Sequence, residues 1–142
     1  MLAINNLPSS LNTDTHTSRI LYGSEIDGAV KKHIFEAVSS VKIASAFCKA
    51  NTFRALAESI HHKIQRKTLI VRWQMRDLLS GASDLEVYES AKELGWKVFI
   101  NQDLHAKVYS FDQIAIIGSA NLTNRGMLVV PRFYMVKWRM LI

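Results

Sequence analysis

The sequence has a single cysteine and no long apolar run, and both absences limit where the protein can work. With Cys48 alone, no internal disulfide can form, which suits a reducing compartment. No apolar run approaches the length of a transmembrane helix, and the first residues lack the basic start and long apolar core of a signal peptide. We therefore expect a cytoplasmic protein with no transmembrane segment.

Acidic residues are the minority charge. The chain of 142 residues carries 18 Lys and Arg against 12 Asp and Glu, which gives a net charge of +6 and a sequence pI of about 9.6. A basic chain favours polyanions, either nucleic acid or an anionic phospholipid surface, over neutral metabolites. The simpler alternative is that the charge serves solubility. The length and the 49% apolar content fit one small domain with one core and leave no room for a second catalytic domain.

Hydrophobic periodicity predicts alternating helices and strands after a polar start. Residues 1–24, rich in Ser, Thr, Asn and Asp, are expected to form an irregular leader, and residues 25–142 a single domain. A first helix is expected over 25–39, followed by strands at 41–47, 68–73 and 96–100, helices at 52–63 and 85–94, and finally a hairpin. This order predicts an α/β sandwich with a mostly parallel sheet, helices flanking its faces, and a β-hairpin at the end that carries the site.

Two short β-like runs near the end of this pattern carry polar side chains at alternating positions. His105 and Lys107 are two residues apart in the first run, and Ser119 and Asn121 are two apart in the second. Residues two apart on a strand share a face, so each pair points to one side. With a three-residue loop at 112–114, His105 lies opposite Asn121 and Lys107 opposite Ser119, and all four phosphate-seeking side chains converge.

The stretch resembles the signature of the phospholipase D superfamily: His-x-Lys, four residues, Asp, about six residues, then Gly-Ser-x-Asn. The matching residues are His105, Lys107, Asp112, Gly118, Ser119 and Asn121. The one departure is that only residues 113–117 separate Asp112 from Gly118, as in a shortened hairpin tip. Neither half of the motif is informative alone, but the two in order, joined by alternating apolar residues, are specific. The resemblance implies a phospholipase D-like fold.

The resemblance also implies a phosphodiesterase that needs no metal and no other cofactor. A neutral imidazole is a competent nucleophile toward phosphorus, and the resemblance gives this role to His105, with a phosphohistidine intermediate. Lys107 supplies a fixed positive charge, and Ser119 and Asn121 donate hydrogen bonds to the phosphate oxygens as negative charge develops. No carboxylate or His/Cys cluster near the motif has the spacing of a metal site. Asp112, at the hairpin turn, is expected to be structural.

The mechanism needs a second histidine, but the sequence has one His-x-Lys motif. Family members with a single motif form a homodimer, in which two copies of the nucleophile meet at one phosphate and take different roles. We therefore expect a homodimer with one shared site. His16 in the polar leader, and His33, His61 and His62 on expected helices, are weaker candidates for the general acid.

Arg72 and Arg76 follow the expected strand at 68–73, beside an aromatic residue. Two guanidinium groups and a ring can grip a nucleic-acid backbone, although such a pair at a strand exit is as often simply solvated. We treat both arginines as candidate nucleic-acid-binding residues.

Acidic residues are missing from the last stretch of the sequence, since no Asp or Glu follows Asp112. The family normally has a carboxylate there that hydrogen-bonds the second ring nitrogen of the nucleophile. The stretch is therefore either a truncated remnant or a strand that completes the dimer. Three functions stay open: a DNA endonuclease, a nucleic-acid-binding module without catalysis, and a phospholipid phosphodiesterase. Nucleic acid is favoured, because lipid-processing relatives usually carry two motifs in one long chain.

Overall fold

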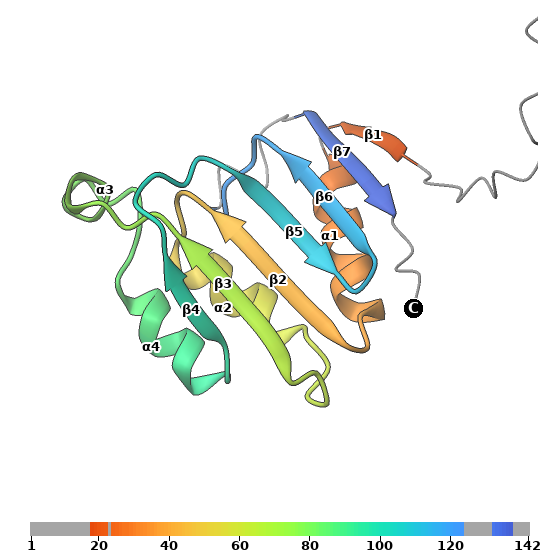
Figure 1. Cartoon of the computed structure of the whole chain (residues 1–142), viewed down its shortest axis with the longest axis horizontal. Coiled ribbons are helices and arrows are strands. Elements are labelled where there is room, and N and C mark those ends of the chain that lie inside the picture. The colour runs from red at the N-terminus through yellow and green to blue at the C-terminus, as the bar shows by residue number, and fades with distance from the viewer. Residues whose placement is uncertain (1–17, 23, 124–131, 138–142) are drawn as a thin grey trace, which may run out of the picture.

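The computed structural model describes residues 18–22, 24–123 and 132–137, which form one seven-stranded sheet and its helices (Figure 1). The strands are β1 (Ser18–Tyr22), β2 (Ser40–Ser45), β3 (Arg66–Val71), β4 (Lys97–Ile100), β5 (Lys107–Phe111), β6 (Ile114–Gly118) and β7 (Arg132–Lys137). The helices are α1 (Ser24–Glu36), α2 (Ala50–Glu58), α3 (Met75–Leu79) and α4 (Glu86–Glu93). Within these ranges, no helix is long and apolar enough to cross a membrane.

The sheet is mixed, with strand order β1-β7-β6-β5-β2-β3-β4. Strand β3 pairs in parallel with both β2 and β4, because helices connect these three strands. All the other neighbouring strands in this order are antiparallel. The expectation of a mostly parallel sheet was therefore wrong outside β2, β3 and β4. The short hairpin β5–β6 and the added strands β1 and β7 make the remainder antiparallel.

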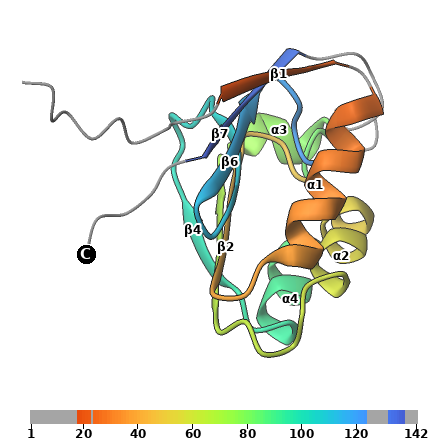
Figure 2. The same ribbon diagram turned by 90° about the vertical axis from the view of Figure 1, so that its right-hand side faces the viewer.

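Helices α1, α2 and α4 all lie on one side of the sheet (Figure 2), which corrects the expectation of helices on both faces. The core lies between these helices and the sheet. Ile26, Val30 and Ile34 of α1 are buried there, as their spacing predicts, together with Phe53 of α2. Val38 lies four residues after Ile34, within the helix expected over 25–39, but it is 80% exposed because α1 ends at Glu36.

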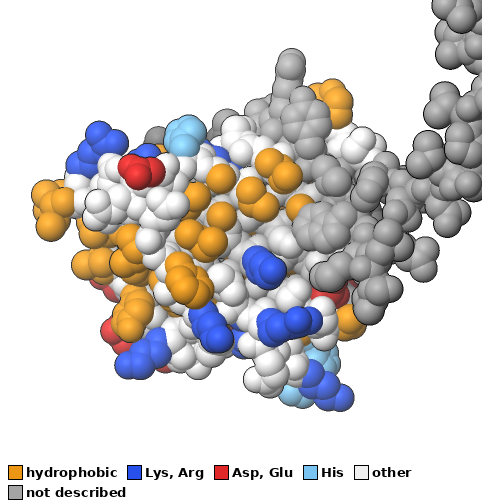
Figure 3. Space-filling model, in the orientation of Figure 1, with side chains coloured by type: hydrophobic (Ala, Val, Ile, Leu, Met, Phe, Trp, Pro, Cys, Tyr) orange, Lys and Arg blue, Asp and Glu red, His pale blue; other side chains and the backbone are white. Residues whose placement is uncertain are grey.

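The other face of the sheet, which none of the described helices covers and which we call the open face, carries both apolar and basic side chains (Figure 3). The register places one apolar residue from each of six strands in a row across it: Ile20, Ile117, Val108, Ala44, Ile70 and Phe99. Lys42 and Lys97 are exposed in the neighbouring row, on either side of Thr68. This face therefore combines an apolar row with positive charge.

Two terminal strands correct the domain limits expected from the sequence. Residues 18–22 form β1 and α1 begins at Ser24, so an irregular leader does not reach residue 24; residues 1–17 lie outside the described part. The early sequence is mostly polar, so the short β-forming run from Ile20 to Tyr22 did not predict a strand. This run pairs with β7, far along the chain. In the C-terminal stretch, residues 132–137 add β7 to the chain's own sheet, between β1 and β6.

The hairpin between β5 and β6 has a two-residue loop, not the expected three. Phe111 pairs with Ile114, which leaves only Asp112 and Gln113 in the turn. Asp112 has a φ of 50°, the left-handed conformation that tight hairpin loops require and that Asp tolerates. The expected pairs of His105 with Asn121 and of Lys107 with Ser119 are therefore wrong, because Val108 pairs with Ile117.

Candidate active site

The motif residues gather at one edge of the sheet. Strands β2, β3 and β4 all end at this edge, and β5 starts there because it runs antiparallel to β2 (Figure 1). His105 lies just before β5 and Lys107 is its first residue, opposite Ser45 of β2. Strand β6 runs back to the same edge and ends at Gly118, so Ser119 and Asn121 follow there. Ligands commonly bind along this edge of α/β sheets.

Lys107 is held beside His105 by the backbone. Its side chain is buried, and Nζ donates a hydrogen bond of 2.6 Å to the His105 carbonyl while lying 3.4 Å from His105 Nε2. Burial lowers the pKa of Lys107, and the positive charge of Arg72 lowers it further. A cation is thus fixed next to the imidazole, which is itself exposed.

The three other described histidines do not come near His105. His61 and His62 stack on each other between α2 and the start of β3, at the opposite edge of the sheet. His33 lines a hollow at that same opposite edge, together with Asp112. Within the described ranges, no three His, Cys, Asp or Glu side chains are grouped so as to hold a metal ion.

Asn121 is anchored to the end of β2. The backbone N–H of Phe47 donates to Asn121 Oδ1 at 3.2 Å, so the side-chain oxygen faces Phe47 and the amide nitrogen is turned away from it. The next residue is held as well, because Leu122 N donates to Ser45 Oγ at 2.8 Å and Leu122 O accepts from Lys49 N at 3.0 Å. The Asn121 side chain is therefore oriented as a hydrogen-bond donor.

Ser119 is placed less firmly than the other three motif residues. It is exposed in the bend that follows β6, and no hydrogen bond joins it to His105, Lys107 or Asn121 among the described residues. Because the chain has left the strand at this point, the face that strand alternation would assign to Ser119 no longer applies. The structure thus brings Ser119 to the same edge without showing it directed at the other three.

Arg72 and Arg76 differ sharply in their surroundings. The Arg72 guanidinium makes two hydrogen bonds to the Asp77 carboxylate, of 2.7 and 2.9 Å, and lies 4.7 Å from the centre of the Phe47 ring. Its side chain is 12% exposed, whereas that of Arg76 is 75% exposed, with Nε 3.8 Å from Asp77. Arg72 is therefore an inward-facing cation close to Lys107, and Arg76 is a surface cation.

Asp112 lies at the edge opposite to the motif histidine. Its carboxylate accepts hydrogen bonds from the backbone N–H groups of Val38, Ser39 and Ser40 and from the Ser39 hydroxyl, at 2.7 to 2.9 Å. Burial raises the pKa of Asp112, but these hydrogen bonds outweigh it and bring the pKa below its usual value. Asp112 therefore ties the β5–β6 turn to the loop before β2.

A family model decides what this arrangement belongs to. Residues 30–130 match the model described as "Cardiolipin synthase, PLD-like domain", which covers most of the chain and includes the whole motif. The chain belongs to this PLD-like family. The predicted membership of the phospholipase D superfamily is therefore confirmed. No curated protein sequence matches the chain.

Solved structures confirm the PLD-like fold. The phospholipase D family member Nuc from Salmonella typhimurium matches with a TM-score of 0.63 at 16% identity, over 88% of this chain and 84% of Nuc. NucT from Helicobacter pylori matches with a TM-score of 0.65 at 18% identity, over 86% of each chain. The archaeal chromatin protein TrmBL2 matches at 12% identity with a TM-score of 0.53, over 88% of this chain and 48% of TrmBL2.

Sequence reasoning missed two residues, Phe47 and Asp77, that shape the site of this PLD-like domain. Phe47 orients Asn121 through its backbone and contacts Arg72 with its ring. Asp77 is buried and holds Arg72 through hydrogen bonds. The sequence contained one indication of this pair, because Asp77 follows Arg72 by only five residues. The role of Phe47 had no such signal, because its partners lie far away in the sequence.

Proposed function

We propose that this PLD-like domain is a metal-independent phosphodiesterase that cleaves DNA as an endonuclease. The observation that carries the proposal is the pairing of an exposed His105 with a buried Lys107, whose Nζ lies 3.4 Å from His105 Nε2. Burying a cation costs free energy unless an anion pairs with it. The Lys107 ammonium is fixed where a phosphate bound by the imidazole would place its negative charge. Asn121 adds an oriented donor at the same edge.

The reaction has two displacement steps. His105 Nε2 attacks the phosphorus of a phosphodiester, an N–P bond forms, and the bond from phosphorus to the leaving oxygen breaks. A second histidine gives the leaving oxygen its proton. That histidine then takes a proton from water, the water oxygen attacks phosphorus, and the N–P bond breaks to release a phosphomonoester and free His105. Lys107, Asn121 and Ser119 stabilise the charge on the non-bridging oxygens in both steps.

A second copy of His105 supplies the second histidine in this proposal. His33, His61 and His62 lie at the opposite edge of the sheet, so none of them reaches a phosphate at His105. An isologous homodimer brings the two His105 side chains to one phosphate, where they take the two roles. Mixing tests this arrangement. The native chain is refolded with an equal amount of His105→Ala, and the activity is compared with that of the same total amount of native chain. About a quarter of the activity remains if two histidines share a site, and about half if each chain works alone.

Nucleic acid is the substrate best supported by charge. The net charge of +6 favours a polyanionic backbone, and TrmBL2, whose fold is similar, is described as a chromatin protein with a mode of DNA binding. The enzymatic alternative is a phospholipid phosphodiesterase, since the matching family model is described for cardiolipin synthase. A non-catalytic DNA-binding module with the same phosphate-binding residues is the other alternative.

Plasmid nicking tests the proposal directly. The purified chain is incubated with supercoiled DNA in excess EDTA beside His105→Ala and, as a matched control, His62→Ala at the opposite edge of the sheet. Cleavage by the native chain and by His62→Ala, with none by His105→Ala, supports the proposal. Binding without cleavage by all three proteins overturns it in favour of the DNA-binding module. Cleavage of phosphatidylglycerol vesicles but not of DNA overturns it in favour of the lipid enzyme.

A further inference from the structure

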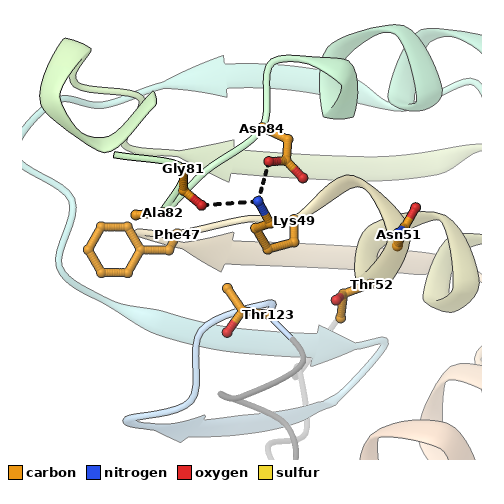
Figure 4. A pocket seen from close by; sticks show the side chains of 8 residues that line it. All are labelled: Phe47, Lys49, Asn51, Thr52, Gly81, Ala82, Asp84 and Thr123. Carbon is orange, nitrogen blue, oxygen red and sulfur yellow. Dashed lines mark hydrogen bonds and ion pairs between the residues drawn. The ribbon is translucent and has the colours of Figure 1, made fainter. Parts of the chain in front are cut away.

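A cavity of about 560 Å³ adjoins the candidate active site and has no part in the mechanism above (Figure 4). It lies between the end of β2, the first turn of α2 and the loop that follows α3. Two of its lining residues connect it to the site. Phe47 binds Asn121 through its backbone N–H, and Thr123 follows Asn121 by two residues. A ligand whose phosphate lies at His105 therefore has the cavity beside it.

The charged side chains of the described cavity wall neutralise each other. Of the described residues that line it, only Lys49 and Asp84 are charged, and they form an ion pair (Figure 4). Lys49 Nζ also donates to the Gly81 carbonyl at 3.0 Å, and Asp84 also accepts from the backbone N–H of Ala50 at 2.9 Å, at the start of α2. With its cation paired and the helix terminus occupied by a carboxylate, the cavity offers little to a second phosphate.

The remaining wall suits a flat, neutral group with polar edges. Phe47 and Ala82 supply apolar surface, and Asn51 supplies an amide. The Arg72 guanidinium lies 4.7 Å from the centre of the Phe47 ring. Asp77 holds this guanidinium in place through hydrogen bonds. Aromatic rings and arginine planes are the surfaces on which unpaired nucleobases stack. The base edge can then bond to the amide and backbone groups of the wall.

We propose that this cavity receives an unpaired nucleobase of the nucleotide whose phosphate binds at His105, Lys107 and Asn121. The inference rests on the proposed function and adds a strand requirement to it. A base stacked within a duplex cannot enter the cavity, so the substrate must present an unpaired base, as single-stranded DNA, an opened end or the locally unwound stretches of supercoiled DNA do.

Small phosphate ligands test the cavity without any need for turnover. Isothermal titration of the full chain compares thymidine 3′-phosphate and thymidine 5′-phosphate, each with its abasic deoxyribose phosphate, so that the pairs differ only in the base. One of the two nucleotides is expected to bind at least about fivefold more tightly than its abasic match, the lower end of what stacking contributes. Ala82→Phe, which fills the cavity, is expected to remove this preference while binding of the abasic ligand persists.

Two further variants keep the result interpretable. Ala44→Phe makes the same change on the open face of the sheet and is expected to keep the preference. Phe47→Leu keeps apolar bulk without an aromatic ring and is expected to weaken the preference, which covers the case in which Ala82→Phe does not fold.

Equal binding of nucleotide and abasic ligand, or a preference that survives Ala82→Phe and Phe47→Leu, overturns the base site and leaves the proposed function intact. Failure of every phosphate ligand to bind overturns both. Binding of phosphatidylglycerol vesicles that Ala82→Phe abolishes overturns the base site in favour of a lipid group.

Discussion

The buried hydroxyl of Tyr109 donates a hydrogen bond of 2.9 Å to the carbonyl of Ala120, the residue between Ser119 and Asn121. Burial raises the pKa of Tyr109, so its hydroxyl stays protonated and remains a donor. This bond joins the strand that begins at Lys107 to the segment that holds Asn121. The two halves of the motif are therefore held together through the core, independently of their side chains.

Tyr109→Phe tests this link. It leaves the Ala120 carbonyl buried without its partner, so we expect the free energy of unfolding to fall by about 1–3 kcal/mol. DNA cleavage should fall as well, because the segment of Asn121 loses its anchor. Urea unfolding and a nicking assay measure the two effects. Tyr88→Phe, on an exposed side chain, is the control and should change stability by less than about 0.5 kcal/mol. Unchanged stability and activity in Tyr109→Phe would show that the bond is not what holds the segment.

Asp112→Asn should destabilise the fold without acting on the site. Asn tolerates the φ of 50°, so the change isolates the carboxylate, whose hydrogen bonds to Val38, Ser39 and Ser40 are together worth roughly 1–3 kcal/mol. The folded-state pKa of Asp112 is lowered, so this stabilisation is present above the unfolded pKa near 3.8 and is lost as pH falls through the folded value.

Urea unfolding at several pH values checks the Asp112 prediction. The difference in unfolding free energy between the native chain and Asp112→Asn should be largest near neutral pH and should shrink in acid. Asp103→Asn, an exposed aspartate, is the control. A difference that stays constant with pH, or grows in acid, would contradict the role given to the carboxylate.

Lys107→Met should separate stability from activity. Burial disfavours the Lys107 ammonium, so an apolar side chain of similar length should leave stability unchanged or raise it. Loss of the fixed charge beside the phosphate should lower the cleavage rate by about 100-fold or more. Thermal unfolding and single-turnover cleavage report the two quantities. A variant that is strongly destabilised yet fully active would reverse the account, because Lys107 would then be a structural residue.

Substitutions of Arg72 and Arg76 should have different effects, on stability for Arg72 and on DNA binding for Arg76. Arg72→Lys cannot keep both hydrogen bonds to the buried Asp77, so it should lose stability although the charge is retained. Arg76→Ala removes an exposed side chain, so stability should stay within about 0.5 kcal/mol. If Arg76 contacts a DNA phosphate, its removal should lower the dependence of log affinity on log salt by about one. Fluorescence anisotropy with a labelled oligonucleotide at several salt concentrations measures this. An unchanged salt dependence would show Arg76 to be only a solvated surface group.

Local patterns in the sequence were enough for the parallel half of the sheet. Strands β2, β3 and β4 and helices α1, α2 and α4 all lie within the predicted segments or within a few residues of them, because their apolar spacing is set by local burial. Strand β1 was not predicted, and a strand in the C-terminal stretch was considered only as one that completes a dimer. Each of β1 and β7 depends on pairing with the other across the length of the chain. The helix α3 has five residues and was too short to give a periodic signal.

The candidate site likewise has features that the sequence predicted and features that it did not. The motif spacing placed His105, Lys107, Ser119 and Asn121 at one edge of the sheet, although the predicted register was wrong. The register depends on the left-handed backbone of Asp112 and on its hydrogen bonds to residues 38–40, which no local pattern reveals. The contacts of Phe47 with Asn121 and Arg72 likewise arise only when three distant segments meet.

Capture of the covalent intermediate tests the central claim most directly. A labelled oligonucleotide is incubated with the chain in EDTA, the reaction is quenched with base to protect the N–P bond, and the digested peptides are analysed by mass spectrometry. The account predicts a nucleotide phosphate on the peptide that contains His105, with none in His105→Ala and an unchanged yield in His62→Ala. Cleavage that proceeds with no adduct, or with an adduct on any other residue, would contradict His105 as the nucleophile.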